Sequence, residues 1–270
     1  MARPRFATAT IAFVAALLAT DAAAQAPPLI TEAPDHYGLF SNYNFHIGIE
    51  TLSGDDHRFQ FDMDAGGDLD IWDYVAGRVN VAFNYEAILG EEYQAFDPNQ
   101  GNYQIEISSS ARLGRTEVTG VYYHTSRHYG DRPKVFGIAW NLLGVQVAHA
   151  RRTDRDDWQL RARGGKTTAN FYVDYDAEIT ADARYARRVH PHVSIIGRAS
   201  GIVRTIDKRL SSRSAQRGGR IEAAVRLIGR GAGVEFYTGY EQRIEADAID
   251  ARPMRWTFLG FRVESLDRGR

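Results

Sequence analysis

The chain has 270 residues, a formal net charge of −1, no cysteine and 11% aromatic residues, of which tyrosine is the most abundant. The near-neutral charge argues against a nucleic-acid partner, and without cysteine there is no disulfide framework. Beyond the N-terminal segment no stretch reaches the roughly 18 to 20 consecutive apolar residues of a transmembrane helix, so we expect no helical membrane span.

The N-terminal segment predicts export. Two arginines, a short apolar run and an alanine triplet precede Gln25, which is the pattern of a cleavable signal sequence. We therefore expect a signal sequence over residues 1–24. Residues 25–40 contain several prolines, which disfavour strand and helix, and are expected to form a periplasmic linker.

From residue 41 to residue 264, apolar and polar residues alternate with a period of two. Phe59, Phe61 and Met63, for example, are separated by polar side chains, and helical periodicity is nowhere comparable. Most apparent strands reach or exceed the roughly 9 to 11 residues that a tilted membrane-spanning strand requires. The pattern predicts twelve strands, over 41–52, 57–74, 77–89, 102–113, 116–130, 135–150, 157–164, 169–189, 192–205, 219–229, 233–244 and 254–264.

The connections between these strands alternate in length. Short turns, such as 114–115 and 190–191, alternate with longer polar loops, which is typical of bacterial outer-membrane barrels with both termini in the periplasm. The predicted fold class is all-β: a closed antiparallel transmembrane β-barrel of about 12 strands over 41–264, located in the outer membrane, with residues 265–270 as a C-terminal tail. A soluble exported β-sandwich is the alternative, but its strands usually have only about 5 to 6 residues.

The polar face of this barrel is predicted to line its lumen. Twelve strands enclose a narrower lumen than the roughly 16 to 18 strands of a porin. Long side chains of both signs are therefore expected to plug it with ion pairs, although a narrow selective channel remains the alternative. The expected lining includes Asp62, Asp64, Glu86, Glu106, Arg161, Arg163, Arg198, Arg204, Glu222, Arg226, Glu235, Glu241 and Arg243.

The hairpin of residues 116–150 contains three polar residues, His124, Ser126 and Asn141, that a membrane-spanning barrel does not require. If residues 131–134 form its loop, Asn141 stands directly opposite His124, at the roughly 4.5 to 5.5 Å separation of cross-strand neighbours. If the loop instead spans 127–134, His124 faces Gly137 and the group does not form.

The preceding hairpin predicts which face this group occupies. A two-residue turn at Gly114-Arg115 places His124 beside Ile105 and Ser126 beside Tyr103, on the apolar, lipid-facing side. Polar side chains on that side lose their hydration, and an ionisable group within a membrane is by default a functional hypothesis.

Residues 124–126 (His-Thr-Ser) and 140–141 (Trp-Asn) resemble the motifs of outer-membrane phospholipase A, a twelve-stranded barrel with a catalytic triad on its lipid-facing exterior. The resemblance implies Ser126 as nucleophile, His124 as general base and Asn141 as the group that orients the imidazole. It also implies calcium as the one cofactor to consider, and we expect no other. The expected partners are membrane lipids, the outer-membrane assembly machinery and a second copy of the chain in a homodimer.

Other interpretations of the same segment remain open. The longer pattern His-x-Ser-x-His-x-Gly-Asp over 124–131 is similar to that of outer-membrane barrels of unassigned activity, in which the histidines lie at the membrane interface. A metal site of His124, His128 and Asp131 is disfavoured, because the two histidines stand roughly 13 Å apart on one strand. Elsewhere, Gly164-Gly165, Gly229-Arg230-Gly231 and His190-Pro191-His192 are expected to be turns.

Overall fold

The computed structural model describes residues 34–91, 93–130, 136–247, 249 and 251–265. The predicted signal sequence, most of the predicted linker, the hairpin loop at 131–134 and tail residues 266–270 lie outside the described residues. The described part forms no helix long and apolar enough to cross a membrane.

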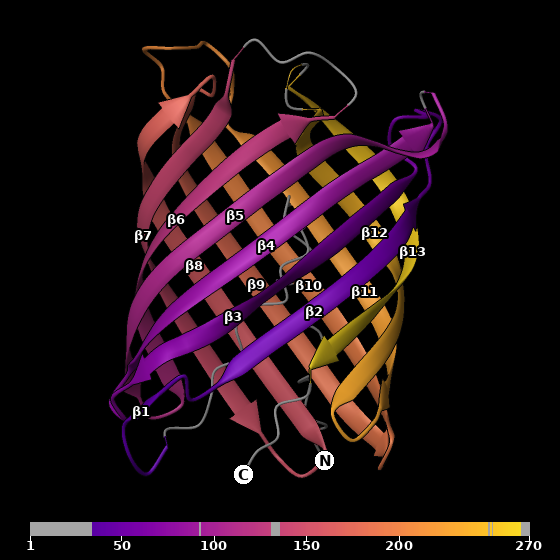
Figure 1. Cartoon of the computed structure of the whole chain (residues 1–270). Helices are drawn as coiled ribbons and strands as arrows, with labels where there is room; N and C mark the ends of the chain where they lie inside the picture. The colour runs from indigo at the N-terminus through magenta and orange to yellow at the C-terminus, as the bar shows by residue number, and fades with distance from the viewer. Residues whose placement is uncertain (1–33, 92, 131–135, 248, 250, 266–270) are drawn as a thin grey trace, which may run out of the picture.

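Twelve long strands and one short strand form a single antiparallel sheet that closes on itself (Figure 1). Each long strand pairs with the next along the chain, and β13 pairs with β2 to complete the barrel. This confirms the predicted fold class. The strands are β1 (Gly38–Leu39), β2 (Tyr43–Leu52), β3 (Phe61–Asp73), β4 (Arg78–Glu91), β5 (Ala95–Leu113), β6 (Thr116–Tyr129), β7 (Ile138–Arg152), β8 (Asp156–Phe171), β9 (Tyr175–His190), β10 (Val193–Ile206), β11 (Gln216–Ile228), β12 (Ala232–Asp247) and β13 (Arg252–Ser265).

The turns that follow β3, β5, β7, β9 and β11 lie together at one end of the barrel, where β2 begins and β13 ends (Figure 1). In outer-membrane barrels this is the periplasmic end. The turns predicted at Gly114-Arg115, His190-Pro191-His192 and Gly229-Arg230-Gly231 are confirmed.

The prediction for residues 157–164 was wrong in its end point. We expected Gly164-Gly165 to form a turn, but β8 continues through both glycines to Phe171. Gly165 pairs with Gly144 of β7, and a Cβ atom on Gly144 would collide with the carbonyl oxygen of Gly164. The glycines therefore allow two strands to approach closely rather than allowing the chain to reverse.

Two smaller differences concern segments predicted to be irregular. Residues 90–101 were expected to form a loop, yet β5 begins at Ala95 and pairs with the end of β4. The last part of the predicted linker contains β1, which pairs with the end of β3. Both segments carry few of the alternating apolar residues that identify a strand.

The outer wall of the barrel is apolar. Large hydrophobic side chains remain exposed along the strands, including Leu143 at 57%, Val145 at 54%, Phe236 at 54% and Leu259 at 63% exposure. A protein in water buries such side chains, whereas a hydrocarbon environment accommodates them.

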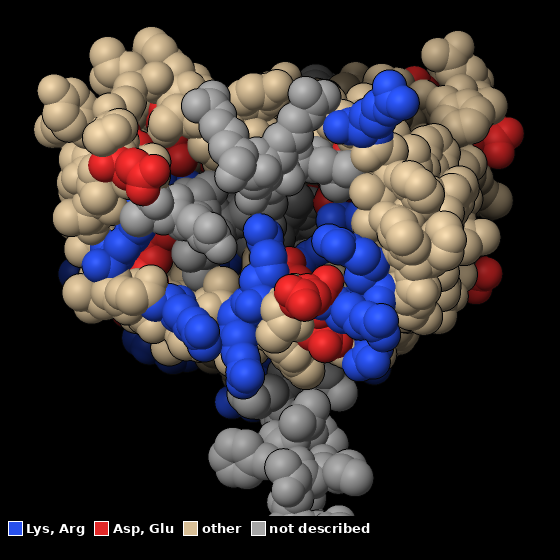
Figure 2. All heavy atoms as spheres, turned by 90° about the horizontal axis from the view of Figure 1, so that it is seen from below, with Lys and Arg blue, Asp and Glu red and all other residues tan. Residues whose placement is uncertain are grey.

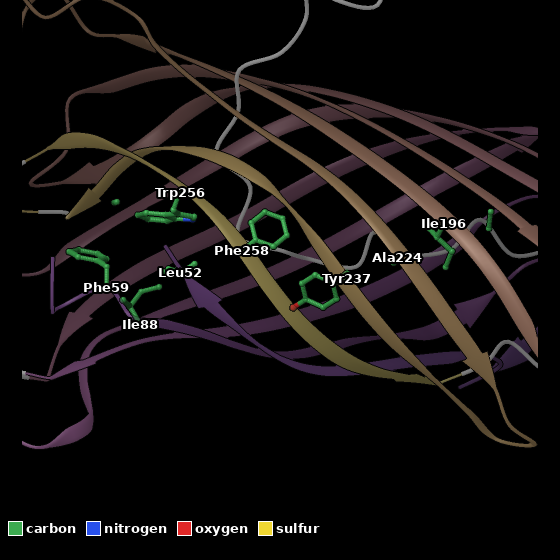
Figure 3. Packing of buried hydrophobic residues seen from close by; sticks show 10 residues of the cluster. Leu52, Phe59, Ile88, Ile196, Ala224, Tyr237, Trp256 and Phe258 are labelled. Atoms are coloured by element: carbon green, nitrogen blue, oxygen red, sulfur yellow. The ribbon is translucent and has the colours of Figure 1, made fainter. Parts of the chain in front are cut away.

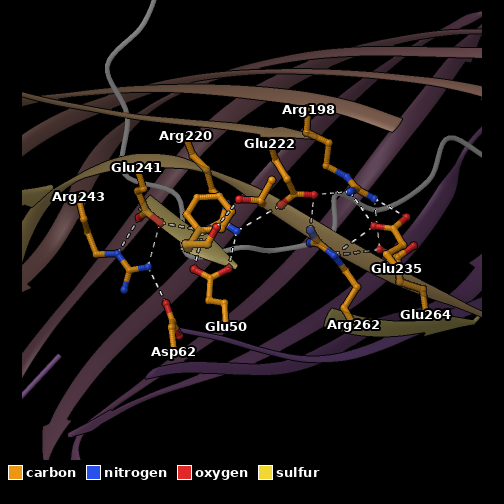
Figure 4. Close-up of polar contacts among 12 residues, drawn as sticks. Glu50, Asp62, Arg198, Arg220, Glu222, Glu235, Glu241, Arg243, Arg262 and Glu264 are labelled. Carbon is orange, nitrogen blue, oxygen red and sulfur yellow. Dashed lines mark hydrogen bonds and ion pairs between the residues drawn. The ribbon is translucent and has the colours of Figure 1, made fainter. Parts of the chain in front are cut away.

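The lumen contains the charged side chains, as predicted, and they are bound to each other (Figure 4). Arg220 donates to both carboxylate oxygens of Glu50, at 2.8 and 2.6 Å, and to Glu241 at 2.8 Å. Arg243 donates to Glu241 at 2.8 Å and to Asp62 at 2.6 Å. The network continues toward the periplasmic end through Arg198, Glu222, Arg226, Glu235, Arg262 and Glu264.

Aromatic rings on the inner wall, among them Tyr237 and Phe258, belong to a buried cluster (Figure 3) and also support these guanidinium groups. The guanidinium carbon of Arg220 lies 3.6 Å from the ring centroid of Phe258, and that of Arg262 lies 4.0 Å from the centroid of Tyr237. Such contacts stabilise a cation that has left water.

We predict that Arg220→Ala destabilises the barrel by about 3 to 5 kcal/mol, because it leaves the carboxylate of Glu50 buried without its partner and removes one of the two arginines that bind Glu241. Urea unfolding in detergent, followed by the gel mobility of the folded barrel, measures the change. As a control, Arg209→Ala removes an ion pair with Asp207 whose arginine is 87% exposed, and the expected change is much smaller because water and salt screen the pair. Equal changes in the two variants would contradict the prediction.

Candidate active site

Strand β6 places three polar side chains on the outer wall. His124, Ser126 and His128 lie on the same face as the exposed Tyr122, while Tyr123 points into the lumen and is only 1% exposed. The ladder between β5 and β6 pairs His124 with Ile105 and Ser126 with Tyr103, as predicted.

His124 and Asn141 form the best-defined contact of the site. The ladder between β6 and β7 pairs them directly, which confirms the register predicted for a loop at 131–134. The Nδ1 atom of His124 lies 2.6 Å from the side-chain oxygen Oδ1 of Asn141. Because Oδ1 only accepts, Nδ1 carries the hydrogen, and in the neutral ring Nε2 is then the free acceptor. This is the tautomer that a general base requires.

The hydroxyl of Ser126 has a different partner. Its Oγ atom lies 2.9 Å from Nε2 of His128, and it forms no hydrogen bond with the ring of His124. The edge of the His128 ring packs against Tyr103, with 5.2 Å between ring centroids. The structure thus brings together His124 and Asn141 as one pair, and Ser126 and His128 as a second pair on the same face.

His128 is the residue of the site that sequence reasoning did not assign. It was interpreted as an interface residue or as a member of the disfavoured metal site, although its spacing of two from Ser126 equals that of His124 on the other side. Same-face neighbours in a strand are equally distant in both directions, roughly 7 Å between Cα atoms. The equal spacing on both sides of Ser126 could have identified His128. The motif that resembles outer-membrane phospholipase A includes only the histidine on the other side, His124.

Small residues flank Ser126 on the outer wall. Its partner on β7 is Ala139, whose own partner on β8 is Phe171, and the neighbouring Gly137 is exposed. On the other side Tyr103 packs against Tyr85, with 4.8 Å between ring centroids. The hydroxyl therefore has the aromatic Tyr103 directly on one side and the small Ala139 directly on the other.

The inner face of the same strands is held by stacked arginines. The guanidinium carbon of Arg163 lies 4.6 Å from the ring centroid of Tyr123. The hydroxyl of Tyr123 donates to Glu178 at 2.5 Å. Arg204 lies 5.1 Å from Trp140 and also binds Glu178, at 2.7 Å. A lumen cavity of about 100 Å³ lies behind this segment, lined by Thr125, Arg127, Trp140, Arg163, Glu178 and Arg204 among others. These contacts hold β6 and β7 in register where they carry the outer pairs.

No group of three or more histidine or acidic side chains in the described part of the chain is placed to hold a metal ion. Calcium takes about 6 to 8 oxygen ligands, usually with carboxylates among them. The ladder neighbours of Ser126, Tyr103 and Ala139, supply no carboxylate. The described residues beside Ser126 therefore offer calcium no carboxylate ligand, and Asp131 of the alternative metal site lies outside the described residues.

No protein-family model and no curated protein sequence matches the chain. Solved structures do match it over most of its length. Outer membrane phospholipase A from Escherichia coli is 12% identical, with a TM-score of 0.52 over 85% of this chain and 98% of that one. The calcium-bound phospholipase dimer from Salmonella typhi is 11% identical, with a TM-score of 0.51 over 88% of this chain and 95% of that one. An outer membrane channel from Pseudomonas putida F1 is 12% identical, with a TM-score of 0.51 over 87% and 99%.

At these identities the likeness concerns the fold, since a phospholipase and a channel share it equally. Together with the closed sheet and the apolar outer wall, it identifies the chain as a bacterial outer-membrane β-barrel. Its location is the outer membrane.

We predict that His124 carries its proton on Nδ1 in the folded protein. Nitrogen-15 NMR of histidine-labelled protein in micelles distinguishes the two tautomers at neutral pH. Asn141→Ala removes the acceptor and is expected to abolish the preference, whereas a dominant Nε2-protonated form in the unsubstituted protein would contradict the geometry.

Proposed function

We propose that this barrel is a lipid-facing serine hydrolase that cleaves acyl ester bonds of membrane phospholipids. The observation that carries the proposal is the 2.6 Å contact between His124 and Asn141, one same-face step from Ser126 on the outer wall. An imidazole with a free Nε2 beside a hydroxyl is the arrangement that activates a serine nucleophile.

The reaction divides into acylation and deacylation. Ser126 Oγ attacks the ester carbonyl carbon while His124 Nε2 takes the hydroxyl proton, and Asn141 holds the Nδ1 hydrogen of the resulting imidazolium. His124 then protonates the leaving alcohol oxygen as the ester C–O bond breaks. A water molecule, deprotonated by His124, cleaves the acyl–serine bond, and the proton returns to Ser126.

Ser126 must turn from His128 toward His124 before it reacts. This requires rotation about its χ1 angle from one staggered position to another, since the two histidines stand one same-face step away in opposite directions. In this scheme His128 holds the hydroxyl in a resting position, and an arriving ester displaces that contact.

The position of the site favours a substrate that is already in the membrane. The wall below it carries exposed Ile105, Tyr122 and Leu143, along which acyl chains can lie. The phospholipid does not have to leave the bilayer, because its ester bond reaches Ser126 by lateral diffusion. The Salmonella typhi relative is a dimer, and we propose a homodimer for this chain as well, assembled like other barrels by the outer-membrane assembly machinery.

We predict release of fatty acid from phospholipid in mixed detergent micelles, and its loss by a factor of about 10⁴ or more in Ser126→Ala. The substitution removes only a surface hydroxyl, so the variant should keep the gel mobility of the folded barrel. Lipolysis that survives the substitution would exclude Ser126 as nucleophile.

Two histidine variants form matched controls for the base. His124→Ala is expected to reduce activity as severely as Ser126→Ala, whereas His128→Ala should reduce it by less than about tenfold, the effect of losing one hydrogen bond of roughly 1 kcal/mol. The reverse order would assign the general base to His128. A folded protein with no lipolytic activity would return the chain to the outer-membrane barrels of unassigned activity.

We further propose that the lumen is plugged. The proposal is supported by the buried ion pairs of Arg220 and Arg243, which extend across the lumen to Glu50 and Asp62. Purified protein in planar bilayers is therefore expected to show no steady conductance, with a large porin in the same bilayers as positive control. Stable single-channel steps would instead favour the narrow selective channel.

A further inference from the structure

Two arginine pairs mark the periplasmic ends of neighbouring strands. Arg151-Arg152 ends β7, Arg187-Arg188 lies near the end of β9, and β8 runs between them. Because successive residues of a strand point to opposite faces, each pair contributes one outward and one inward side chain. Arg151 and Arg187 are the outward members, on the same face as Val147 and Val189, which are 45% and 54% exposed.

Aromatic residues lie between the outward arginines. Trp158 of β8 pairs with Arg151 on one side and with Tyr185 on the other. The rings of Trp158 and Tyr185 are 4.2 Å apart between centroids, and Trp158 is 50% exposed. Tryptophan and tyrosine in this position characterise the depth at which lipid headgroups begin.

The two arginines keep donors available. Arg151 is exposed and forms no ion pair with any residue in the described part of the chain. Arg187 has a side chain that is 54% exposed, and it contacts Asp156 at 3.4 Å and the side chain of Tyr185. Asp156 also accepts from the Tyr185 hydroxyl at 2.7 Å, so its charge is partly satisfied and it holds Arg187 in place.

Further basic side chains surround this group. Seen from the periplasmic end, lysine and arginine side chains gather along one side of the mouth, with acidic side chains among them (Figure 2). Arg155, in the turn after β7, and Arg230, in the turn after β11, are exposed as well.

We propose that Arg151, Arg187, Trp158 and Tyr185 form a binding site for the phosphate of a phospholipid headgroup in the periplasmic leaflet. The Cα atoms of the two arginines are separated by two strand spacings, about 10 Å across the sheet, and one same-face step, about 7 Å along it. Two long side chains that converge across this distance can hold one phosphate by charge-assisted hydrogen bonds. The aromatic pair would lie beneath the headgroup and contact its glycerol and upper acyl carbons.

Native mass spectrometry of the full folded protein in detergent tests this proposal. Phosphatidylglycerol is added in increasing amounts, and the lipid-bound fraction is compared with that for phosphatidylethanolamine, whose ammonium group offsets the phosphate charge. We expect tighter binding of phosphatidylglycerol and a roughly 30-fold loss of its affinity in the double variant R151Q/R187Q, because each arginine loses its charge-assisted hydrogen bond to the phosphate.

The matched control is R155Q/R230Q, which removes the same charge from two turns of the same rim and should change the affinity by less than about threefold. Equal losses in the two double variants would overturn the site in favour of general charge attraction. Displacement of the lipid by inorganic phosphate at millimolar concentration would overturn the lipid as ligand and point to a soluble anion. Gel mobility confirms that each variant is folded.

Discussion

Closure of the sheet is the constraint on which the rest of this structure depends. Hydrocarbon offers no hydrogen-bond partner, so every backbone amide in the membrane must pair within the protein, and the pairing of β13 with β2 removes the last open edge. A closed antiparallel sheet has only two faces. Once one faces lipid, alternation along each strand sends every second residue into a narrow lumen. The polar composition of that lumen follows from the strand pattern alone.

The enclosed charges then require one another. A carboxylate such as Glu241 is fully buried, and removal of water from it is costly unless arginines compensate. Arg220 of β11 and Arg243 of β12 both bind it. Each arginine also bridges strands that lie far apart in sequence, as Arg220 does to Glu50. A strand shifted by one residue would turn its inward charge into lipid, so these pairs select the register as well as stabilise it.

The same alternation explains how much could be predicted from the sequence. Strand number, face assignment and the pairing of His124 with Asn141 follow from period-two patterns and short turns, because a ladder propagates its register residue by residue. Gly164 and Gly165 were misinterpreted because glycine serves close strand packing and chain reversal alike, and only a neighbouring strand distinguishes these uses. The contact of Ser126 with His128 depends on side-chain rotation, which periodicity does not determine.

Strand β6 departs from the rule of an apolar outer wall, and the form of the departure is informative. A lone hydroxyl or imidazole facing lipid would lose hydration without replacement, at a cost of roughly 1 to 3 kcal/mol. Here the donors and acceptors satisfy each other, since His124 binds Asn141 and Ser126 binds His128. Paired in this way, the polar residues are compatible with the membrane in the absence of substrate. The contact of Ser126 is also the one an ester can exchange most readily. Both of its partners lie on β6 and reach the surface, whereas the His124–Asn141 pair is anchored on two strands. In the proposed mechanism, the arrangement thus separates a fixed base from a movable hydroxyl, and a lipid-facing nucleophile needs both properties.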